Sequence, residues 1–128
     1  MGELIVLRHG QTEWSRSGQH TSVTDLPLLP EGEEQARGLR EPMGRRHLVE
    51  VRVSPRERAR RTAELAGLPV DTVDEDLVEV DYGGYEGMTT PEISEELGRP
   101  WSLWADGTVP GATPGETLAA VAARVDRV

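Results

Sequence analysis

The sequence predicts an α/β fold with a mostly parallel sheet. Residues 4–7 form a continuous apolar run, Leu-Ile-Val-Leu, which is typical of a strand buried on both faces. Strand-like and helix-like segments then alternate along the chain, as they do in parallel α/β folds. Three of the expected helices carry a start signature in which a serine or threonine is followed by a proline and a glutamate.

The elements are expected in a regular order after a polar, glycine-bearing loop that begins at residues 8–10 and runs to about residue 29. We expect helices over 30–46, 55–66, 90–97 and 114–128, and further strands over 48–53 and 70–73. Pro42 should end or kink the first of these helices near Arg40, because proline cannot continue the helical hydrogen-bond ladder. Ser54 and Thr113 should cap the starts of their helices, and Thr89 with Glu92 should form a capping box.

Length and composition limit the classes of function. A chain of 128 residues has room for one domain, over residues 1–128, and its net charge of −9 argues against nucleic acid or an anionic membrane as a partner. The absence of cysteine excludes disulfides and a cysteine nucleophile, and no stretch of the sequence is long and apolar enough to span a membrane. With no secretory signal pattern at the N-terminus, we expect a cytoplasmic protein. All 14 basic residues are arginine, so phosphate recognition would fall to arginine alone.

Arg8, His9 and Gly10 follow directly after the first expected strand. Ligands of open α/β sheets bind outside the carboxyl ends of strands. A neutral imidazole is a good phosphoryl acceptor, and a guanidinium beside it can hold phosphate oxygens with two parallel donors. The alternative is that Arg-His-Gly is an ordinary loop tripeptide, since short motifs also match by chance.

Two further segments carry candidate chemistry. Arg58 lies near the start of an expected helix, where free N–H groups and the helix dipole attract anions. The neighbouring arginines are better explained as a solvated helix face; they are Arg56, Arg60 and Arg61. Glu79 ends a strand-like stretch and could protonate a leaving alkoxide, although Asp81 and Glu86 compete for that role on composition alone.

Taken together these segments resemble the histidine phosphatase superfamily. The resemblance rests on five groups of residues: Leu7 to Ser15; Thr24 to Leu28 with Gly32 and Gln35-Ala36; Ser54-Pro55 with Arg58-Ala59 and Thr62-Ala63; Glu79 with Tyr82-Gly83 and Glu86-Gly87; and Pro114 to Thr117. It implies a three-layer α/β/α fold of the phosphoglycerate-mutase type. The short stretch between the acid and the last motif favours hydrolysis over mutase chemistry, and the nearest branches resemble acid phosphatases and sugar bisphosphatases.

The resemblance also implies a role for each site residue. His9 would carry the phosphoryl group, Arg8 and Arg58 would clamp it, and Glu79 would donate a proton to the leaving group. The implied substrate contacts are Ser15, His20, Thr21, Ser22 and Tyr82. The resemblance implies neither a metal ion nor a cofactor, and it implies a small phosphorylated metabolite, such as a sugar phosphate, as the substrate.

One feature of the family has no counterpart in this sequence. Members carry a second catalytic histidine in a late loop, and neither His20 nor His47 takes its place. We therefore expect the chain to hold about the N-terminal two thirds of the usual domain. A domain shortened in this way would expose a sheet edge. The chain could cover that edge by pairing with another copy, as a homo-oligomer, or with a separate C-terminal piece. The alternative to a phosphatase is a non-catalytic phosphate-binding or interaction module that has lost this histidine.

Overall fold

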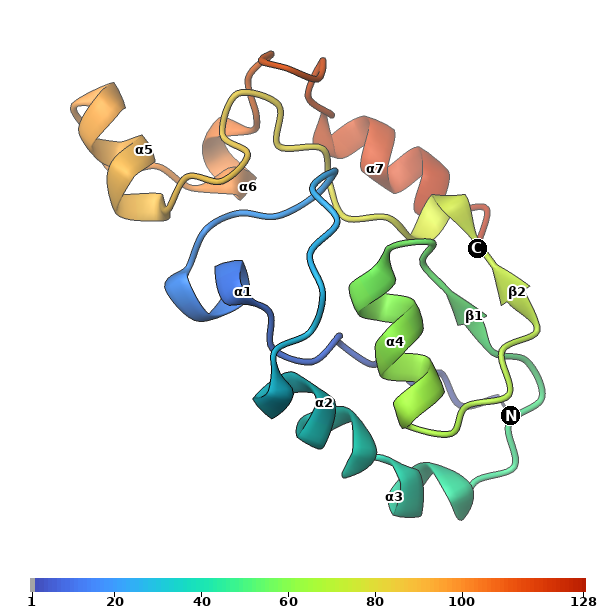
Figure 1. Cartoon of the computed structure of the whole chain (residues 1–128). Helices are drawn as coiled ribbons and strands as arrows, with labels where there is room; N and C mark the ends of the chain where they lie inside the picture. The colour runs from blue at the N-terminus through green and yellow to red at the C-terminus, as the bar shows by residue number, and fades with distance from the viewer. Residues whose placement is uncertain (1) are drawn as a thin grey trace.

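The computed structural model describes residues 2–128 (Figure 1). Its elements, in chain order, are α1 (Glu13–Ser17), α2 (Pro30–Arg37), α3 (Arg40–Gly44), β1 (Arg52–Val53), α4 (Glu57–Leu65), β2 (Thr72–Val73), the 3₁₀ helix η1 (Glu75–Leu77), α5 (Thr90–Leu97), α6 (Leu103–Asp106) and α7 (Leu118–Val125). No helix within residues 2–128 has the length and apolar composition needed to cross a membrane.

The sheet consists of β1 and β2, joined through helix α4. The two strands run parallel, with Arg52 opposite Thr72 and Val53 opposite Val73. A strand, a crossover helix and a parallel strand are the basic unit of α/β folds, so the predicted fold class is confirmed. Both strands are shorter than the predicted spans 48–53 and 70–73.

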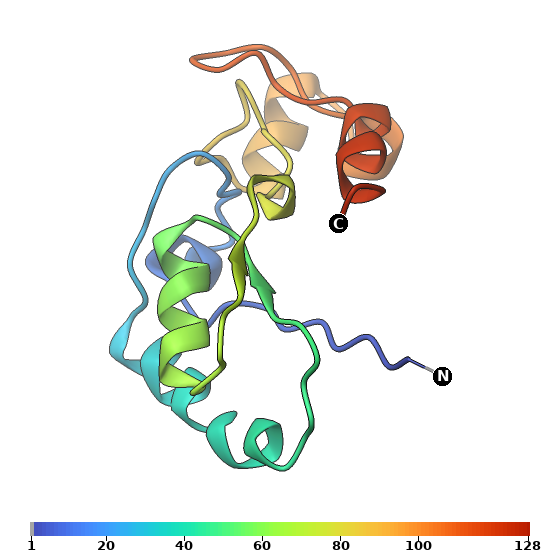
Figure 2. The same cartoon turned by 90° about the vertical axis from the view of Figure 1, so that its right-hand side faces the viewer.

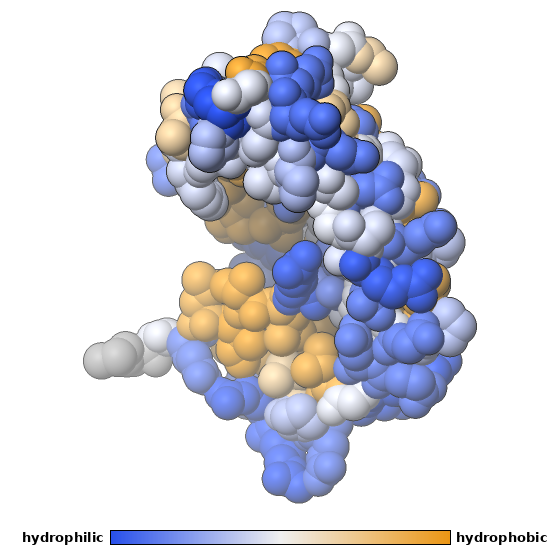
Figure 3. Space-filling model, turned by 90° about the vertical axis from the view of Figure 1, so that its left-hand side faces the viewer, coloured by the Kyte–Doolittle hydropathy of each residue, from blue (hydrophilic) through white to orange (hydrophobic). Residues whose placement is uncertain are grey.

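The predicted buried strand over residues 4–7 is wrong. These residues are extended but belong to no strand, and the side chains of Leu4 and Val6 are 88% and 81% exposed. A strand needs a hydrogen-bonded neighbour, and no backbone group among the described residues pairs with this segment. In Figure 2 the N-terminal segment extends away from the helices. Figure 3 shows apolar residues gathered in a hollow on one face of the molecule.

Side-chain packing is concentrated in two regions, and each contains candidate residues. Helix α4 packs on α2, and the small buried residues Gly32, Ala36 and Ala63 allow a close approach. A second cluster contains the most buried aromatic side chains of the chain; its buried members are Val80, Tyr82, Tyr85, Ile93 and Trp101. The loops that follow His9 and Glu79 are therefore attached to packed structure.

The helix starts match the predicted signatures in one case of three. Thr89 and Glu92 form the expected capping box of α5. Helix α4 begins at Glu57 without a cap from Ser54; its free Glu57 N–H donates instead to Asp25 Oδ1 at 2.8 Å. The predicted Ser54 cap is therefore wrong, because a carboxylate 32 positions earlier in the chain takes that function.

The last helix also begins later than predicted. Helix α7 starts at Leu118, and Thr117 caps it by accepting from the Ala120 N–H at 3.1 Å. The predicted Thr113 cap is wrong because the Thr113 hydroxyl donates to Asp81 Oδ1 at 2.6 Å. Gly115 is in the left-handed region at φ 73°, which keeps the chain out of helix there.

The predicted helix over residues 30–46 is interrupted, as Pro42 indicated. Helix α2 ends at Arg37 and α3 begins at Arg40, so the break falls where a proline interferes with the preceding turn. Three short helices were not predicted: α1, η1 and α6. Each has five residues or fewer, which is too short for a hydrophobic period to be recognised.

Candidate active site

Helix α4 and helix α2 together hold the loop that carries His9. The Gly10 N–H donates to Thr62 Oγ1 at 3.0 Å, and the same hydroxyl donates to the Arg58 carbonyl at 2.7 Å. Gly10 also lies against the backbone of Gly32: a Cβ on Gly10 would be 2.3 Å from the Gly32 carbonyl oxygen. Only glycine allows this approach, so the loop is fixed by backbone contact with both helices.

The imidazole of His9 is oriented by its own loop. Its Nδ1 lies 2.7 Å from the Gly10 carbonyl oxygen. A carbonyl can only accept, so Nδ1 carries the proton in the neutral ring and Nε2 keeps a lone pair. Burial lowers the pKa of His9 below its ordinary value; the Gly10 carbonyl opposes this, while the positive charges of Arg58 and Arg8 lower the pKa further. The neutral, nucleophilic ring is therefore favoured at physiological pH.

The four residues predicted to be catalytic come from three segments of the chain and act on one another electrostatically. The charges of Arg8, Arg58 and Glu79 all influence the pKa of His9. Arg58 lies in the first turn of α4 and is 3% exposed, whereas Arg8 and Glu79 are exposed. The Glu79 carboxylate accepts from the Val80 N–H at 2.8 Å. The structure thus brings together one imidazole, two guanidinium groups and one carboxylate.

The residues of α1 and the following loop that are predicted to contact substrate differ in how far their hydroxyl groups are engaged in internal hydrogen bonds and buried. The Ser15 hydroxyl accepts from the Thr12 N–H at 2.8 Å as part of the α1 capping box. Thr21 donates to the Gln19 carbonyl at 3.2 Å. Ser22 is 1% exposed and its hydroxyl accepts from the Tyr82 N–H at 3.2 Å. In this conformation Ser22 has almost no surface that a substrate could reach, and its contact with substrate stays a prediction.

His20 and Tyr82 pack against each other beside this loop. Their rings meet edge to face at 4.8 Å, and His20 meets Trp101 in the same way at 5.2 Å. His20 Nδ1 lies 2.7 Å from the Met88 carbonyl oxygen, which fixes its neutral tautomer with Nε2 as an acceptor. Burial raises the pKa of Tyr82 to about 12, and the charges of Glu79 and Glu86 act in the same direction. The Tyr82 phenol therefore stays protonated at neutral pH.

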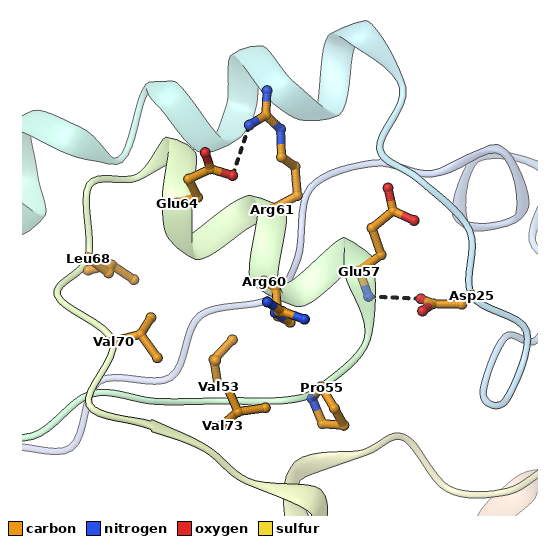
Figure 4. A pocket seen from close by; sticks show the side chains of 10 residues that line it. All are labelled: Asp25, Val53, Pro55, Glu57, Arg60, Arg61, Glu64, Leu68, Val70 and Val73. Carbon is orange, nitrogen blue, oxygen red and sulfur yellow. Dashed lines mark hydrogen bonds and ion pairs between the residues drawn. The ribbon is translucent and has the colours of Figure 1, made fainter.

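Two hollows lie on different sides of α4. One, of about 160 Å³, is lined by Arg8, His9 and residues of α2 and α4. The other, of about 600 Å³, is larger and is lined by Val53, Val70 and Val73 below a charged rim that includes the ion pair Arg61–Glu64 (Figure 4). None of the four predicted catalytic residues lines the larger hollow. Opposite charges on its rim largely offset one another. Two of the four, Arg8 and His9, line the smaller hollow.

Metal chemistry has no candidate site within residues 2–128. No group of three or more histidine, aspartate or glutamate side chains there is arranged to hold a metal ion. Among the described residues, Arg8 and Arg58 are the positive charges that act on His9.

The supporting roles of three residues were not predicted from the sequence. Thr62 connects α4 to Gly10, Asp25 caps α4, and Glu86 accepts from Ser22 and Thr24. Each acts on residues that are 32 to 64 positions away in the chain. No local pattern announces such contacts, although Asp25 and Thr62 lie inside the motifs quoted above.

Comparisons with known proteins agree with this geometry. Residues 4–128 match the family described as the histidine phosphatase superfamily (branch 1). The chain is 40% identical to sedoheptulose 1,7-bisphosphatase of Saccharomyces cerevisiae and 42% identical to an acid phosphatase of Mycobacterium tuberculosis, over 96% of its length in both cases. The solved structure of the open reading frame Rv3214 product of M. tuberculosis superposes with a TM-score of 0.83 at 41% identity.

The matches cover most of this chain but only part of its relatives. The chain spans 52% of the yeast bisphosphatase and 59% of the acid phosphatase. It covers 60% of the Rv3214 structure, which in turn matches 93% of this chain. A family match over residues 4–128, with relatives at 40% identity or more, is sufficient for the assignment. The chain belongs to the histidine phosphatase superfamily, branch 1.

Proposed function

We propose that this chain carries the phosphoryl-accepting part of a phosphatase that hydrolyses small phosphomonoesters through a phosphohistidine on His9. One observation carries the proposal. The His9 ring is held with its Nδ1 on the Gly10 carbonyl, and the positive charges of Arg8 and Arg58 lie close enough to lower its pKa. A neutral imidazole surrounded by cations can attack a dianionic phosphate ester without first losing a proton.

The reaction would proceed in two steps. In the first, Nε2 of His9 attacks phosphorus, the P–O bond to the alcohol breaks, and Glu79, acting as the general acid, gives a proton to the departing alkoxide. In the second, Glu79 takes a proton from water, the water oxygen attacks phosphorus, and the P–N bond breaks to give inorganic phosphate and neutral His9. Arg8 and Arg58 would hold the phosphoryl oxygens throughout and stabilise the charge that spreads over them.

Sugar phosphates are the proposed substrate class. The printed name of the yeast relative describes a sugar bisphosphatase, and that of the mycobacterial relative an acid phosphatase. Both names fit a small phosphomonoester. We propose the cytoplasm as the location, because phosphorylated metabolites are charged and are retained there.

The test is to trap the covalent intermediate. Incubation with a ³²P-labelled sugar phosphate, followed by rapid denaturation in base, should give an acid-labile phosphohistidine that His9→Ala does not form. His47→Ala is the matched control, because His47 is exposed between α3 and β1 and should label like the wild type. Labelling that persists in His9→Ala would overturn the assignment. Binding of inorganic phosphate without any labelling would instead favour the non-catalytic module.

A further inference from the structure

The loop of residues 21–24 is held by a carboxylate on one side. Glu86 accepts hydrogen bonds from the Ser22 N–H at 2.8 Å and from the Thr24 N–H at 3.2 Å, and it also accepts from the Ser22 hydroxyl. A carboxylate has only acceptors, and here both oxygens are occupied by donors of the same loop. This leaves Glu86 poorly placed to give a proton to a substrate, although the sequence alone made it a competitor of Glu79 for that role, because both are acidic.

Arg58 holds the same loop from the other side. Its Nη1 donates to the Thr24 carbonyl at 2.9 Å, and its Nη2 donates to the Ser22 carbonyl at 3.1 Å and the Thr21 carbonyl at 3.5 Å. A buried guanidinium needs such acceptors, since an unsatisfied buried charge is costly. These three hydrogen bonds use three of the five N–H groups of the guanidinium, so its Nε–H and one Nη1–H make no hydrogen bond with residues 2–128.

The two charged side chains are connected through one peptide group. The Ser22 N–H and the Thr21 carbonyl belong to the same peptide unit; the N–H points at Glu86 and the carbonyl oxygen at Arg58. Within the described residues, the Glu86 carboxylate and the Arg58 guanidinium both bind this loop and form no ion pair with each other. The Glu86 carboxylate therefore fixes and polarises the peptide group whose carbonyl accepts a hydrogen bond from Arg58. Hydrogen bonds linked in this way strengthen one another.

We propose that Glu86 is a positioning residue that orients Arg58 for the transferring phosphoryl group by fixing the loop of residues 21–24. The inference rests on the proposed function, since it assigns the Arg58 clamp to that reaction. The fold around Glu86 does not depend on its carboxylate, because backbone hydrogen bonds already join the two loops. The His20 N–H donates to the Met88 carbonyl at 2.9 Å, and the Gly87 N–H donates to the His20 carbonyl at 2.8 Å.

The test uses Glu86→Gln in the full chain, with Glu95→Gln on the exposed face of α5 as the matched control. Hydrogen exchange of the Ser22 and Thr24 amides and the NMR resonance of Arg58 Nε–H report the loop and the guanidinium directly. We expect faster exchange and a shifted Arg58 resonance in Glu86→Gln only. Inorganic phosphate, used as the probe, should bind about tenfold more weakly. Exchange and resonance equal to those of the wild type would overturn the inference.

Turnover separates positioning from proton donation. A positioning role predicts that Glu86→Gln loses the same factor in kcat/KM for p-nitrophenyl phosphate, whose leaving group needs no proton, as for an alkyl phosphate. A loss confined to the alkyl phosphate would identify Glu86 as the proton donor and overturn the inference. The two proposals fail separately: absence of phosphohistidine in the wild type contradicts the proposed function, whereas an unchanged Arg58 in Glu86→Gln contradicts the positioning role. Ser22→Ala, which removes one of the three donors, should show the same changes to a smaller extent.

Discussion

Replacing Thr62 with valine should detach the His9 loop from α4 while keeping the volume of the side chain. The Thr62 hydroxyl is the acceptor for the buried Gly10 N–H and a donor to the Arg58 carbonyl. Valine fills the same space but leaves the Gly10 donor unsatisfied, which costs about 1–3 kcal/mol of stability. For a domain of this size the melting temperature should fall by roughly 4 °C per kcal/mol.

The same substitution should also reduce the rate of phosphoryl transfer to His9. Gly10 supplies the carbonyl that orients His9 Nδ1, so a displaced Gly10 misdirects Nε2. We expect a loss of about tenfold or more, since one such transition-state contact contributes at least about 1.4 kcal/mol. The readouts are thermal unfolding, the rate of ³²P labelling and hydrogen exchange of the Gly10 amide.

Thr62→Ser is the matched control for this prediction. Serine keeps the hydroxyl and loses one buried methyl group, which costs about 1 kcal/mol. It should therefore lose stability but keep both the labelling rate and the protection of the Gly10 amide. The reasoning fails if Thr62→Val protects the Gly10 amide and labels His9 as well as Thr62→Ser does.

Three further predictions concern the same site. Gly10→Ala places a Cβ 2.3 Å from the Gly32 carbonyl oxygen, so its melting temperature should fall sharply, while Gly44→Ala, with nothing within 4 Å, should melt at or slightly above the wild-type temperature. The lowered pKa of His9 predicts that the acidic limb of kcat/KM, which reports loss of the neutral nucleophile, lies below the ordinary histidine pKa of 6.5; a limb above 6.5 would contradict the burial argument. Labelling of His9 should be unchanged in EDTA, because arginines supply the positive charge, and activity lost in EDTA and restored by a divalent ion would refute this.

The parts of the fold that could be predicted from the sequence are those with a local cause. The Thr89–Glu92 capping box needs only four consecutive positions, and it is present. The break between α2 and α3 follows from Pro42 alone. By contrast, an apolar run such as residues 4–7 says only that the chain prefers to be extended and buried. Whether it becomes a strand depends on a neighbour that local sequence does not specify.

The residues of the candidate site divide in the same way, into those that a local sequence motif indicates and those that depend on contacts between distant segments. His9, Arg8, Arg58 and Glu79 could be named in advance because the motifs that contain them are distinctive. The supporting roles of Thr62, Asp25 and Glu86 could not be predicted, because these residues act through contacts 32 to 64 positions away in the chain. Ser54 illustrates the difference: its sequence context predicts a helix cap, but a carboxylate from another loop reaches the Glu57 N–H instead.

An acidic chain with a net charge of −9 can still present a cationic site if its carboxylates support an arginine without neutralising it. Burial lowers the pKa of Arg58, and the negative charge of Asp25 is the first of three that oppose this, with Glu79 and Glu86. None of these carboxylates forms an ion pair with Arg58 among residues 2–128, and backbone carbonyls occupy its Nη groups. The carboxylates thus support the charge of Arg58 without contacting it, and its charge and its two remaining N–H donors stay available for an anion. If a carboxylate formed a direct ion pair with Arg58, phosphate would have to compete with it for the guanidinium. Backbone carbonyl acceptors and carboxylates at a distance avoid this competition.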